Sequence, residues 1–187
     1  MLLFSFGNFD TKTLVLILLA VLIYLYLRYL DKKEKSSTSA ALCKRYATLT
    51  EDTLTALSDE ELLPAVIANL LAKANRRQPD IYIHAAAWSH GRVAVYSVWL
   101  LCRELETADF EKIPAPSRRF AELAVNGFEL LGAANCAEAL RALVTAFADS
   151  TVTAEFSTAL RTAIAKEKPL ALCTAYIREN ITEFCDL

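Results

Sequence analysis

Fourteen consecutive apolar residues, from Leu14 to Leu27, lie near the start of this 187-residue chain. The segment continues to Leu30 and contains one charged residue, Arg28. As an α-helix, the 17 residues from Leu14 to Leu30 would measure about 25 Å, close to the thickness of the hydrocarbon core of a bilayer. A soluble protein rarely has a terminal helix that is apolar on every face. The sequence therefore predicts a transmembrane helix over residues 13–30, with Leu14 to Leu30 in contact with the bilayer.

The residues flanking this segment predict its orientation. Tyr24, Tyr26 and Tyr29 are placed to form an aromatic belt at one membrane surface. Positive residues stand mainly on the C-terminal side of the segment: Lys12 precedes it, whereas Arg28, Lys32, Lys33 and Lys35 lie at its end or follow it. Because the more positive flank stays in the cytoplasm, residues 1–35 are expected to be a single-pass cell-membrane anchor and the rest of the chain to be cytoplasmic.

A cleaved signal peptide is the alternative to an anchor. It would need a basic start and a small-residue cleavage site behind the apolar core. Only Lys12 precedes the core, Asp10 offsets its charge, and no such cleavage site follows Leu30. Lipidation of Cys43 is disfavoured because Leu42 stands where a small residue is expected. The anchor is therefore the preferred interpretation.

Beyond the anchor, the composition indicates closely packed helices. From Ser36 to Leu187, 80 of 152 residues are apolar, but 29 of these are alanine. Alanine is the best helix former and adds little apolar area to a core. The run from Ser36 to Ser39 indicates a polar linker, which places a linker and lead-in at 36–49 and a helical domain at 50–187.

Capping residues and apolar spacing predict an all-α domain of six or seven helices. Ser58 and Glu61 have the spacing of a capping box. Gly132, Asn135 and Thr153 are placed to end or begin helices. The segments with helical spacing are 62–76, 91–105, 117–131, 135–149, 153–167 and 170–184. The one candidate strand, 81–83, has no obvious partner strand.

The cysteines predict free thiols. They are Cys43, Cys102, Cys136, Cys173 and Cys185. An odd count without a CxxC pair is typical neither of a disulfide framework nor of a structural zinc site. Buried or half-buried thiols in a reducing compartment are therefore expected, in agreement with a cytoplasmic domain.

No catalytic motif stands out, and the densest chemical group is a set of carboxylates after the apolar segment 91–105. Glu104, Glu106 and Asp109 could do acid and base work or bind a cation. The alternative is a solvated helix end, paired with Arg118 and Arg119. The two histidines, His84 and His90, with Asp80 nearby, lack the spacing of three or four that favours metal ligands on one helix. Neither a metal nor a cofactor is expected.

Several stretches resemble a bacterial helical domain family named after the C-terminal part of a DNA-mimic protein. They are Leu57 to Leu62, Val95 to Glu104, Phe120 to Leu123, Leu131 to Ala133 and Glu138 to Leu140. In that family the glutamate after the apolar helix is followed by Asn-Gly-Gly-Phe. Here Glu104 and Phe110 match, whereas Thr107, Ala108 and Asp109 stand in place of Asn-Gly-Gly. The resemblance spans about two thirds of the chain and implies a helical fold more than a role, because the replacement of two glycines removes backbone freedom from the turn that carries the family motif. The candidate binding residues are Glu104, Glu106, Asp109 and Phe110.

Charge argues against the DNA mimicry that this family name implies. Residues 36–187 contain 19 acidic and 15 basic residues, a net charge of only −4. A mimic must repeat negative charge along a duplex-like surface, so this balance is weak, and direct nucleic-acid binding is not expected either. The sequence predicts a non-enzymatic, membrane-anchored domain that binds a protein partner. An enzyme or a ligand-binding or cation-binding domain that uses the carboxylates, with His90, is the alternative.

Overall fold

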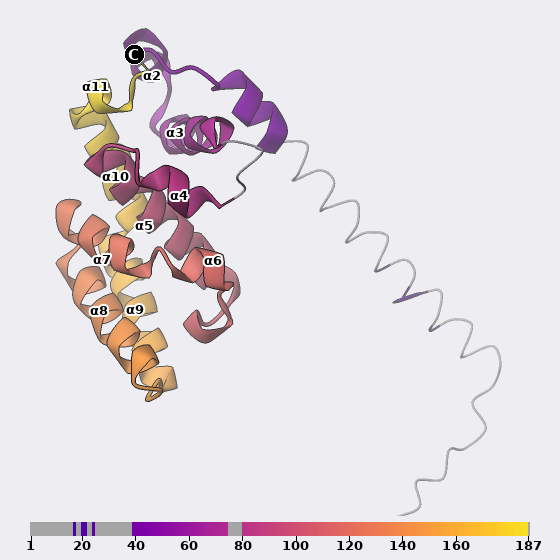
Figure 1. Ribbon diagram of the computed structural model, residues 1–187, viewed down its shortest axis with the longest axis vertical. Helices are drawn as coiled ribbons and strands as arrows, with labels where there is room; N and C mark the ends of the chain where they lie inside the picture. Colours follow the sequence, from indigo (N-terminus) through magenta and orange to yellow (C-terminus); the bar gives the residue numbers. More distant parts are fainter. Residues whose placement is uncertain (1–16, 18–19, 22–23, 25–38, 75–79, 187) are drawn as a thin grey trace, which may run out of the picture. The chain divides into compact units, whose positions relative to one another are not determined.

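The computed structural model describes residues 17, 20–21, 24, 39–74 and 80–186 (Figure 1). The chain divides into two units, Met1–Leu42 and Cys43–Leu187. Most of the predicted transmembrane segment lies outside the described residues, so the span stays a prediction. Within the part that is described, no helix is both long enough and apolar enough to cross a membrane.

The second unit is all-helical in its described residues, which confirms the predicted fold class. From Glu51 onward its described residues form ten α-helices and one 3-10 helix, η1, where six or seven helices were predicted. Their bounds are α2 Glu51–Ala56, α3 Asp59–Lys73, α4 Ile81–Ala85, α5 His90–Thr107, η1 Phe110–Lys112, α6 Ala115–Arg118, α7 Ala121–Leu130, α8 Ala134–Ala148, α9 Ala154–Glu167, α10 Pro169–Glu179 and α11 Ile181–Phe184. The six predicted segments correspond to the helices of ten or more residues, and the additional helices are pieces of one or two turns.

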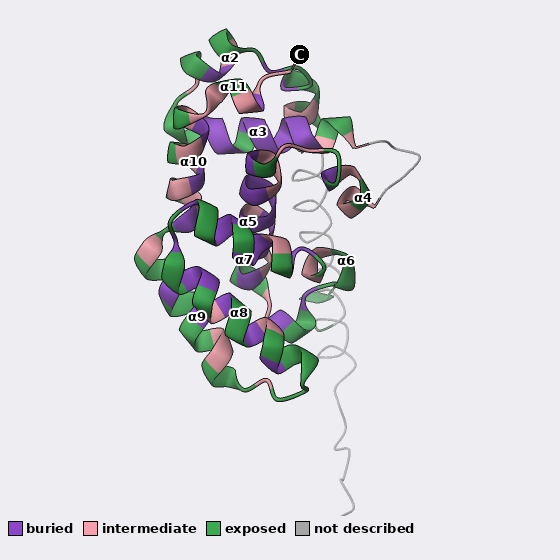
Figure 2. Ribbon diagram, turned by 60° about the vertical axis from the view of Figure 1, so that its left-hand side comes forward, coloured by how far each residue is buried: buried purple, intermediate pink, exposed green. Residues whose placement is uncertain are grey.

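Helix α5 is the centre of this unit. It packs against α7 on one side and against α10 on the other, while α7, α8 and α9 pack in succession (Figure 1). Burial follows this arrangement, because α3 and α5 are buried along most of their length (Figure 2). Val95 and Val98 of α5 are fully buried, as is Phe128 of α7. The apolar character of residues 91–105 therefore reflects a helix enclosed on several sides.

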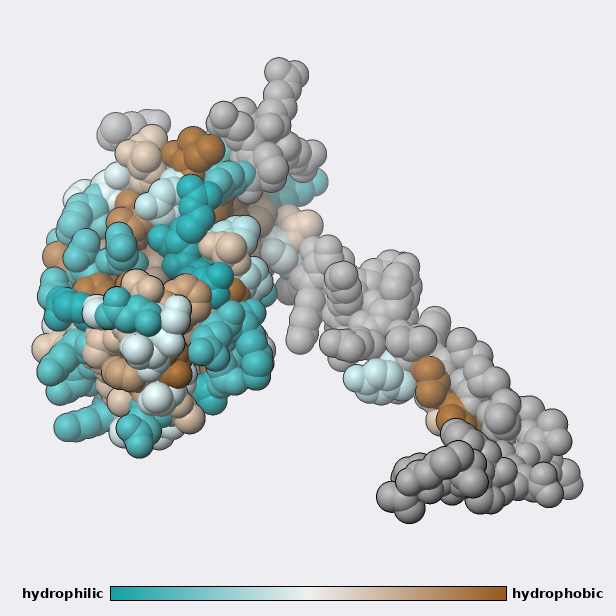
Figure 3. Space-filling view, turned by 60° about the horizontal axis from the view of Figure 1, so that its bottom comes forward, coloured by the Kyte–Doolittle hydropathy of each residue, from teal (hydrophilic) through white to brown (hydrophobic). Residues whose placement is uncertain are grey.

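The surface of the unit is mixed in character. On the face turned toward the viewer in Figure 3, hydrophobic side chains lie among hydrophilic ones. Single exposed apolar side chains of this kind are ordinary on soluble domains.

Three predicted elements differ in the structure. Residues 81–83 form helix α4, not a strand, because Asp80 caps this helix by accepting a hydrogen bond from the backbone N–H of Tyr82 at 3.1 Å. The predicted helix 117–131 is split into α6 and α7. The predicted helix 170–184 is split at Asn180, whose side-chain amide donates to the carbonyl of Tyr176 at 2.9 Å and whose backbone leaves the helical region.

The turn after α7 confirms one predicted cap and corrects another. Gly132 is in the left-handed region with φ +78°, and the N–H of Ala133 donates to the carbonyl of Phe128 at 2.8 Å, which forms a Schellman motif. This turn places Ala133, not Asn135, at the N-cap of α8. The predicted N-cap Thr153 is confirmed by position. The side chain of Glu61 accepts from the backbone N–H of Ser58 at 3.4 Å, as the predicted capping box requires.

Candidate functional site

The predicted carboxylates bind separate partners in the structure. Glu104, in the last turn of α5, accepts a hydrogen bond from the Ser117 hydroxyl at 3.0 Å. Glu106 is exposed. Asp109 forms ion pairs with Lys112 at 2.9 Å and with Arg161 at 3.2 Å. The hydrogen bond and charge of Lys112 hold the pKa of the Asp109 carboxyl below its usual range. Asp109 is therefore a neutralised anion that joins η1 to α9.

Phe110, the fourth residue of the predicted site, is a core side chain. It is 1% exposed and packs edge-to-face on Phe147 of α8, with ring centroids 5.5 Å apart. This contact fixes the turn that follows α5 onto α8. A ligand could reach Phe110 only after that turn had moved.

The two arginines expected to pair with these carboxylates lie elsewhere. Arg118 donates to the carbonyl of Glu111 at 3.0 Å and lies over the Phe147 ring. Arg119 forms an ion pair with Asp80 at 2.7 Å and lies over the Tyr82 ring at 4.5 Å. Arg119 therefore ties α4 to the start of α7, a long-range pairing that the sequence did not indicate.

His90 cannot join Glu104 in one site. The two residues stand at opposite ends of the continuous helix α5, fourteen positions apart. At about 1.5 Å per residue this separation is roughly 21 Å. Among the described residues, no three histidine, cysteine, aspartate or glutamate side chains are arranged to hold a metal ion.

The densest charged cluster lies at the other end of the domain and was not predicted. Asp186 accepts hydrogen bonds from the backbone N–H of Leu49 at 2.9 Å and from the Asn69 amide at 3.0 Å, and it also pairs with Lys73 and Arg92. Burial alone would raise the pKa of the Asp186 carboxyl. The hydrogen bonds from Lys73, Leu49 and Asn69 together have the larger effect, so this pKa lies below its ordinary value. Asp186 is engaged by four partners within the protein, so the cluster joins the ends of the domain to one another. The residues of this cluster are far apart in the sequence, so no local sequence pattern indicated it.

A groove on the described surface is bounded by α4, α5 and α7 and is called here the α4/α7 groove. Its volume is about 480 Å³. It is lined by Tyr82, Ala85, Ala86, Trp88, His90, Val93, Ala94, Leu123, Asn126 and Gly127. The lining is mainly apolar, and its polar groups come from a few side chains such as His90 and Asn126. Binding sites commonly combine a concave apolar lining with a few polar groups in this way.

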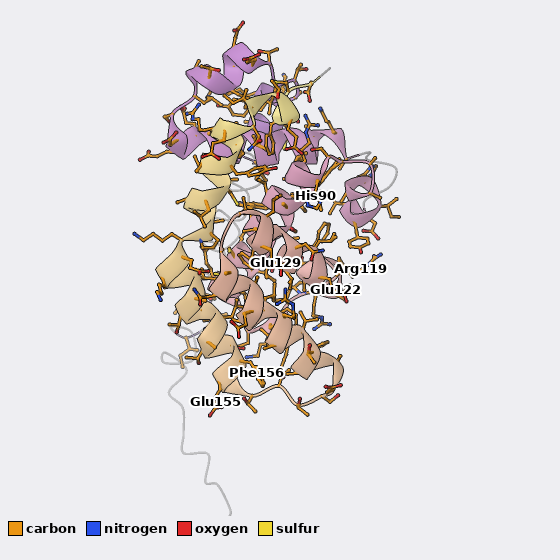
Figure 4. All side chains as sticks on the ribbon, turned by 90° about the vertical axis from the view of Figure 1, so that its left-hand side faces the viewer. His90, Arg119, Glu122, Glu129, Glu155 and Phe156 are labelled. Carbon is orange, nitrogen blue, oxygen red and sulfur yellow. The ribbon has the colours of Figure 1, made fainter. Side chains whose placement is uncertain are left out.

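Close helix packing and stacked rings shape the groove. At Gly127 a side chain would clash, since a Cβ atom would lie 3.0 Å from the Ala94 carbonyl oxygen and 2.9 Å from Val98. Small residues on α5 and α7 therefore form the floor. The Trp88 ring packs edge-to-face on Tyr96, with centroids 5.2 Å apart, which fixes one wall. Figure 4 shows His90 near the start of α5, with Arg119 and Glu122 near the start of α7.

Local sequence patterns indicate this groove only in part. Residues 81–83 appeared strand-like, so the helix that forms one wall was missed. Tyr82 of α4 and Trp88 of the connection to α5 are large aromatic residues, a type that is enriched at binding surfaces.

Comparison of the chain with models of protein families, with curated proteins and with solved structures found no match. The resemblance to the helical domain family therefore stays a prediction from the sequence.

Proposed function

We propose that the chain is a single-pass membrane protein whose cytoplasmic helical domain binds a protein partner in the α4/α7 groove. One observation carries the choice of site: the groove, of about 480 Å³, is lined mainly by apolar and aromatic side chains. Beside it, Ile83 on the outer face of α4 is 52% exposed. Exposed apolar surface next to an apolar groove favours contact with another protein over contact with water.

The membrane anchor in this proposal rests on the sequence. Leu14 to Leu30 form an uninterrupted apolar segment apart from Arg28, and the positive residues cluster at its C-terminal end. An anchor confines the domain to the bilayer surface, where it meets partners at a raised effective concentration. Fusion of an alkaline phosphatase after Leu187 tests the orientation, because this reporter is active only outside the cytoplasm. Low phosphatase activity is expected, and high activity would contradict a cytoplasmic domain.

The carboxylates predicted as an alternative enzyme or cation site give no second proposal. Asp109 is paired with Lys112 and Arg161, Glu104 accepts from Ser117, and His90 lies at the far end of α5. An acid and base pair needs two groups that face one reacting atom. Glu104, Asp109 and His90 each contact different residues, so no two of them face a common reacting atom.

Photo-crosslinking in intact cells tests whether the groove is the binding site. A photoreactive phenylalanine analogue at Asn126, which lines the groove and is exposed, should crosslink to a second protein. The same analogue at Glu155, exposed in the first turn of α9, is the matched control and should give little crosslinking (Figure 4). Equal crosslinking at both positions, or none at Asn126, would count against the proposal.

A further inference from the structure

The outer face of α7 carries a stripe of three side chains beside the groove, two leucines with an asparagine between them. Leu123 and Asn126 line the groove, and Leu130, one turn further on, is 38% exposed. Their spacing of three and four residues places all three along one side of the helix. The opposite side is committed to the core, where Ala124 and Phe128 are fully buried. The stripe is therefore a surface that α7 does not use within its own domain.

The shape of this surface suits a helix. Residues 123 to 130 span about 10 Å along α7, which is two helical turns. A helix laid alongside α7 presents side chains with the same period, so its apolar side chains can interdigitate with Leu123 and Leu130. Strand addition would need a free sheet edge, and the described part of the chain contains no strand.

The charged groups at the rim leave one negative charge unbalanced. Arg119 is neutralised by Asp80 at 2.7 Å, and Glu129 is paired with Arg141. Glu122 is exposed and has no ion pair among the residues that the structure describes. It stands one position before Leu123, near Arg119 at the start of α7 (Figure 4). A positive side chain is therefore the complementary group for this end of the groove.

Taken together, the geometry points to one occupant: we infer that the α4/α7 groove binds an amphipathic helix of the partner, with its apolar face in the groove and a lysine or arginine opposite Glu122. This inference rests on the proposed function and specifies the chemistry of the partner. Helix-in-groove recognition uses apolar anchors that repeat every two turns, and Leu123 and Leu130 of α7 are seven residues apart.

A pair of synthetic helical peptides tests the inference with the full chain in detergent. Each peptide has about 15 residues and leucines at i, i+3 and i+7. One peptide has lysines on the flank of the leucine stripe, and its twin has glutamates there. Fluorescence anisotropy of a label on the peptide measures the dissociation constant. The lysine peptide should bind the wild-type chain more tightly than its twin.

Two charge reversals separate the groove from general electrostatic attraction. E122K should weaken binding of the lysine peptide by about fivefold to tenfold and strengthen binding of its twin, since a surface ion pair becomes a repulsion. E155K makes the same charge change in the first turn of α9, as E122K does in the first turn of α7, so both carry a similar cost in helix stability. E155K should leave both affinities close to wild type.

The outcomes distinguish the inference from the proposed function. Equal effects of E122K and E155K, or tighter binding of the glutamate peptide to wild type, would overturn the inference. If Asn126 still crosslinks to a partner in cells, the proposed function survives that result. Absence of crosslinking at Asn126 removes the proposed function itself, and the inference with it. Identification of the crosslinked peptide by mass spectrometry adds a direct check: a basic helical segment supports the inference, and an acidic or extended segment contradicts it.

Discussion

The side chain of Glu183 accepts a hydrogen bond from the backbone N–H of Gly91 at 2.7 Å, across 92 positions of sequence. Gly91 stands in the first turn of α5, where backbone N–H groups have no partner within the helix. The Tyr176 hydroxyl holds the same carboxylate at 3.2 Å, and Arg92 donates to the Glu183 carbonyl at 2.9 Å. Helix α11 therefore caps the central helix of the domain from outside.

This contact requires glycine at position 91. A Cβ atom there would lie 2.7 Å from both the Glu183 carboxyl carbon and a ring carbon of Tyr176. Gly91→Ala should therefore displace Glu183 and lower the free energy of unfolding by about 1–3 kcal/mol. Urea denaturation followed by circular dichroism measures the change. His90→Ala, at the exposed neighbouring position, is the control and should stay near wild type. A wild-type stability for Gly91→Ala would contradict the capping role.

Asp186 makes a second long-range connection, between the end of the described chain and the residues that precede α2. Asp186→Asn keeps the shape of the side chain but removes the charge that Lys73 and Arg92 face. The loss should be about 2 kcal/mol, the range for hydrogen bonds to a charged group. Asp149→Asn removes a charge at an exposed position after α8 and should change the free energy of unfolding little. Similar denaturation midpoints for the two variants would argue against this role of Asp186.

Glu167 caps α8 from α9, and its effect on stability should depend on pH. Its carboxylate accepts from the backbone N–H groups of Asn135 at 3.1 Å and Cys136 at 2.9 Å. Burial alone would raise the pKa of Glu167. The hydrogen bonds from Asn135 and Cys136 have the larger effect and lower this pKa from 4.5 to about 2. When the pKa of a carboxyl group is lower in the folded state than in the unfolded state, the group stabilises the fold at pH values above its unfolded-state pKa. This stabilisation is lost as the pH falls toward the folded-state pKa.

Glu167→Gln should therefore reduce the free energy of unfolding by about 1 kcal/mol at neutral pH, as loss of a helix cap does. The difference from wild type should shrink as the pH falls from 4.5 toward 2. Thermal unfolding of the wild-type protein and of Glu167→Gln at a series of pH values measures this difference in stability. A difference that stays constant down to pH 2 would mean that the charge of Glu167 is not involved.

The cysteines should fall into two classes of reactivity. Burial raises the pKa of Cys102 to about 12, and it also raises the pKa values of Cys136 and Cys173. Only the thiolate reacts with alkylating reagents, so these three buried thiols should react slowly in the folded protein. Cys43 and Cys185 are half-buried and should react first. Mass spectrometry after a brief iodoacetamide pulse should find label at these two, and all five should be labelled in urea.

The long helices could be predicted because their signals are local. Ser58 with Glu61, Gly132 and Pro169 mark helix ends within a few residues of sequence, and the structure places ends at each of them. The apolar run from 91 to 105 likewise indicated a central helix. Such signals depend on backbone conformation and apolar spacing, which a single sequence displays directly.

The groove and the carboxylate cap of α8 could not be predicted because they depend on long-range contacts. Asn135 has the chemistry of an N-cap, yet Glu167 supplies the carboxylate to α8 from 32 positions away. The pairing of Arg119 with Asp80 places α4 beside α7 and so creates one wall of the groove. Neither pairing has a signature in local spacing. A carboxylate cluster such as Glu104, Glu106 and Asp109 appears dense in sequence, but the structure distributes its members over different contacts.

The turns after α7 and α8 offer a matched test of backbone strain. Both are Schellman motifs, and the left-handed position is Gly132 in one, with φ +78°, and Ser150 in the other, with φ +56°. A residue with a Cβ atom costs about 1 kcal/mol in this conformation, and glycine avoids that cost. No neighbouring heavy atom lies within 4 Å of a Cβ built on Gly132, so substitution there adds only backbone strain.

The two substitutions should therefore change stability in opposite directions. Gly132→Ala should lower the free energy of unfolding by about 1 kcal/mol. Ser150→Gly should raise it by about 0.5 kcal/mol, because relief of strain exceeds the added entropy of glycine in the unfolded chain. Thermal denaturation of both variants, and of the double variant, measures the two effects, which should add because the turns are separate. A loss of stability in Ser150→Gly would show that the Ser150 side chain makes a favourable contact that outweighs its backbone strain.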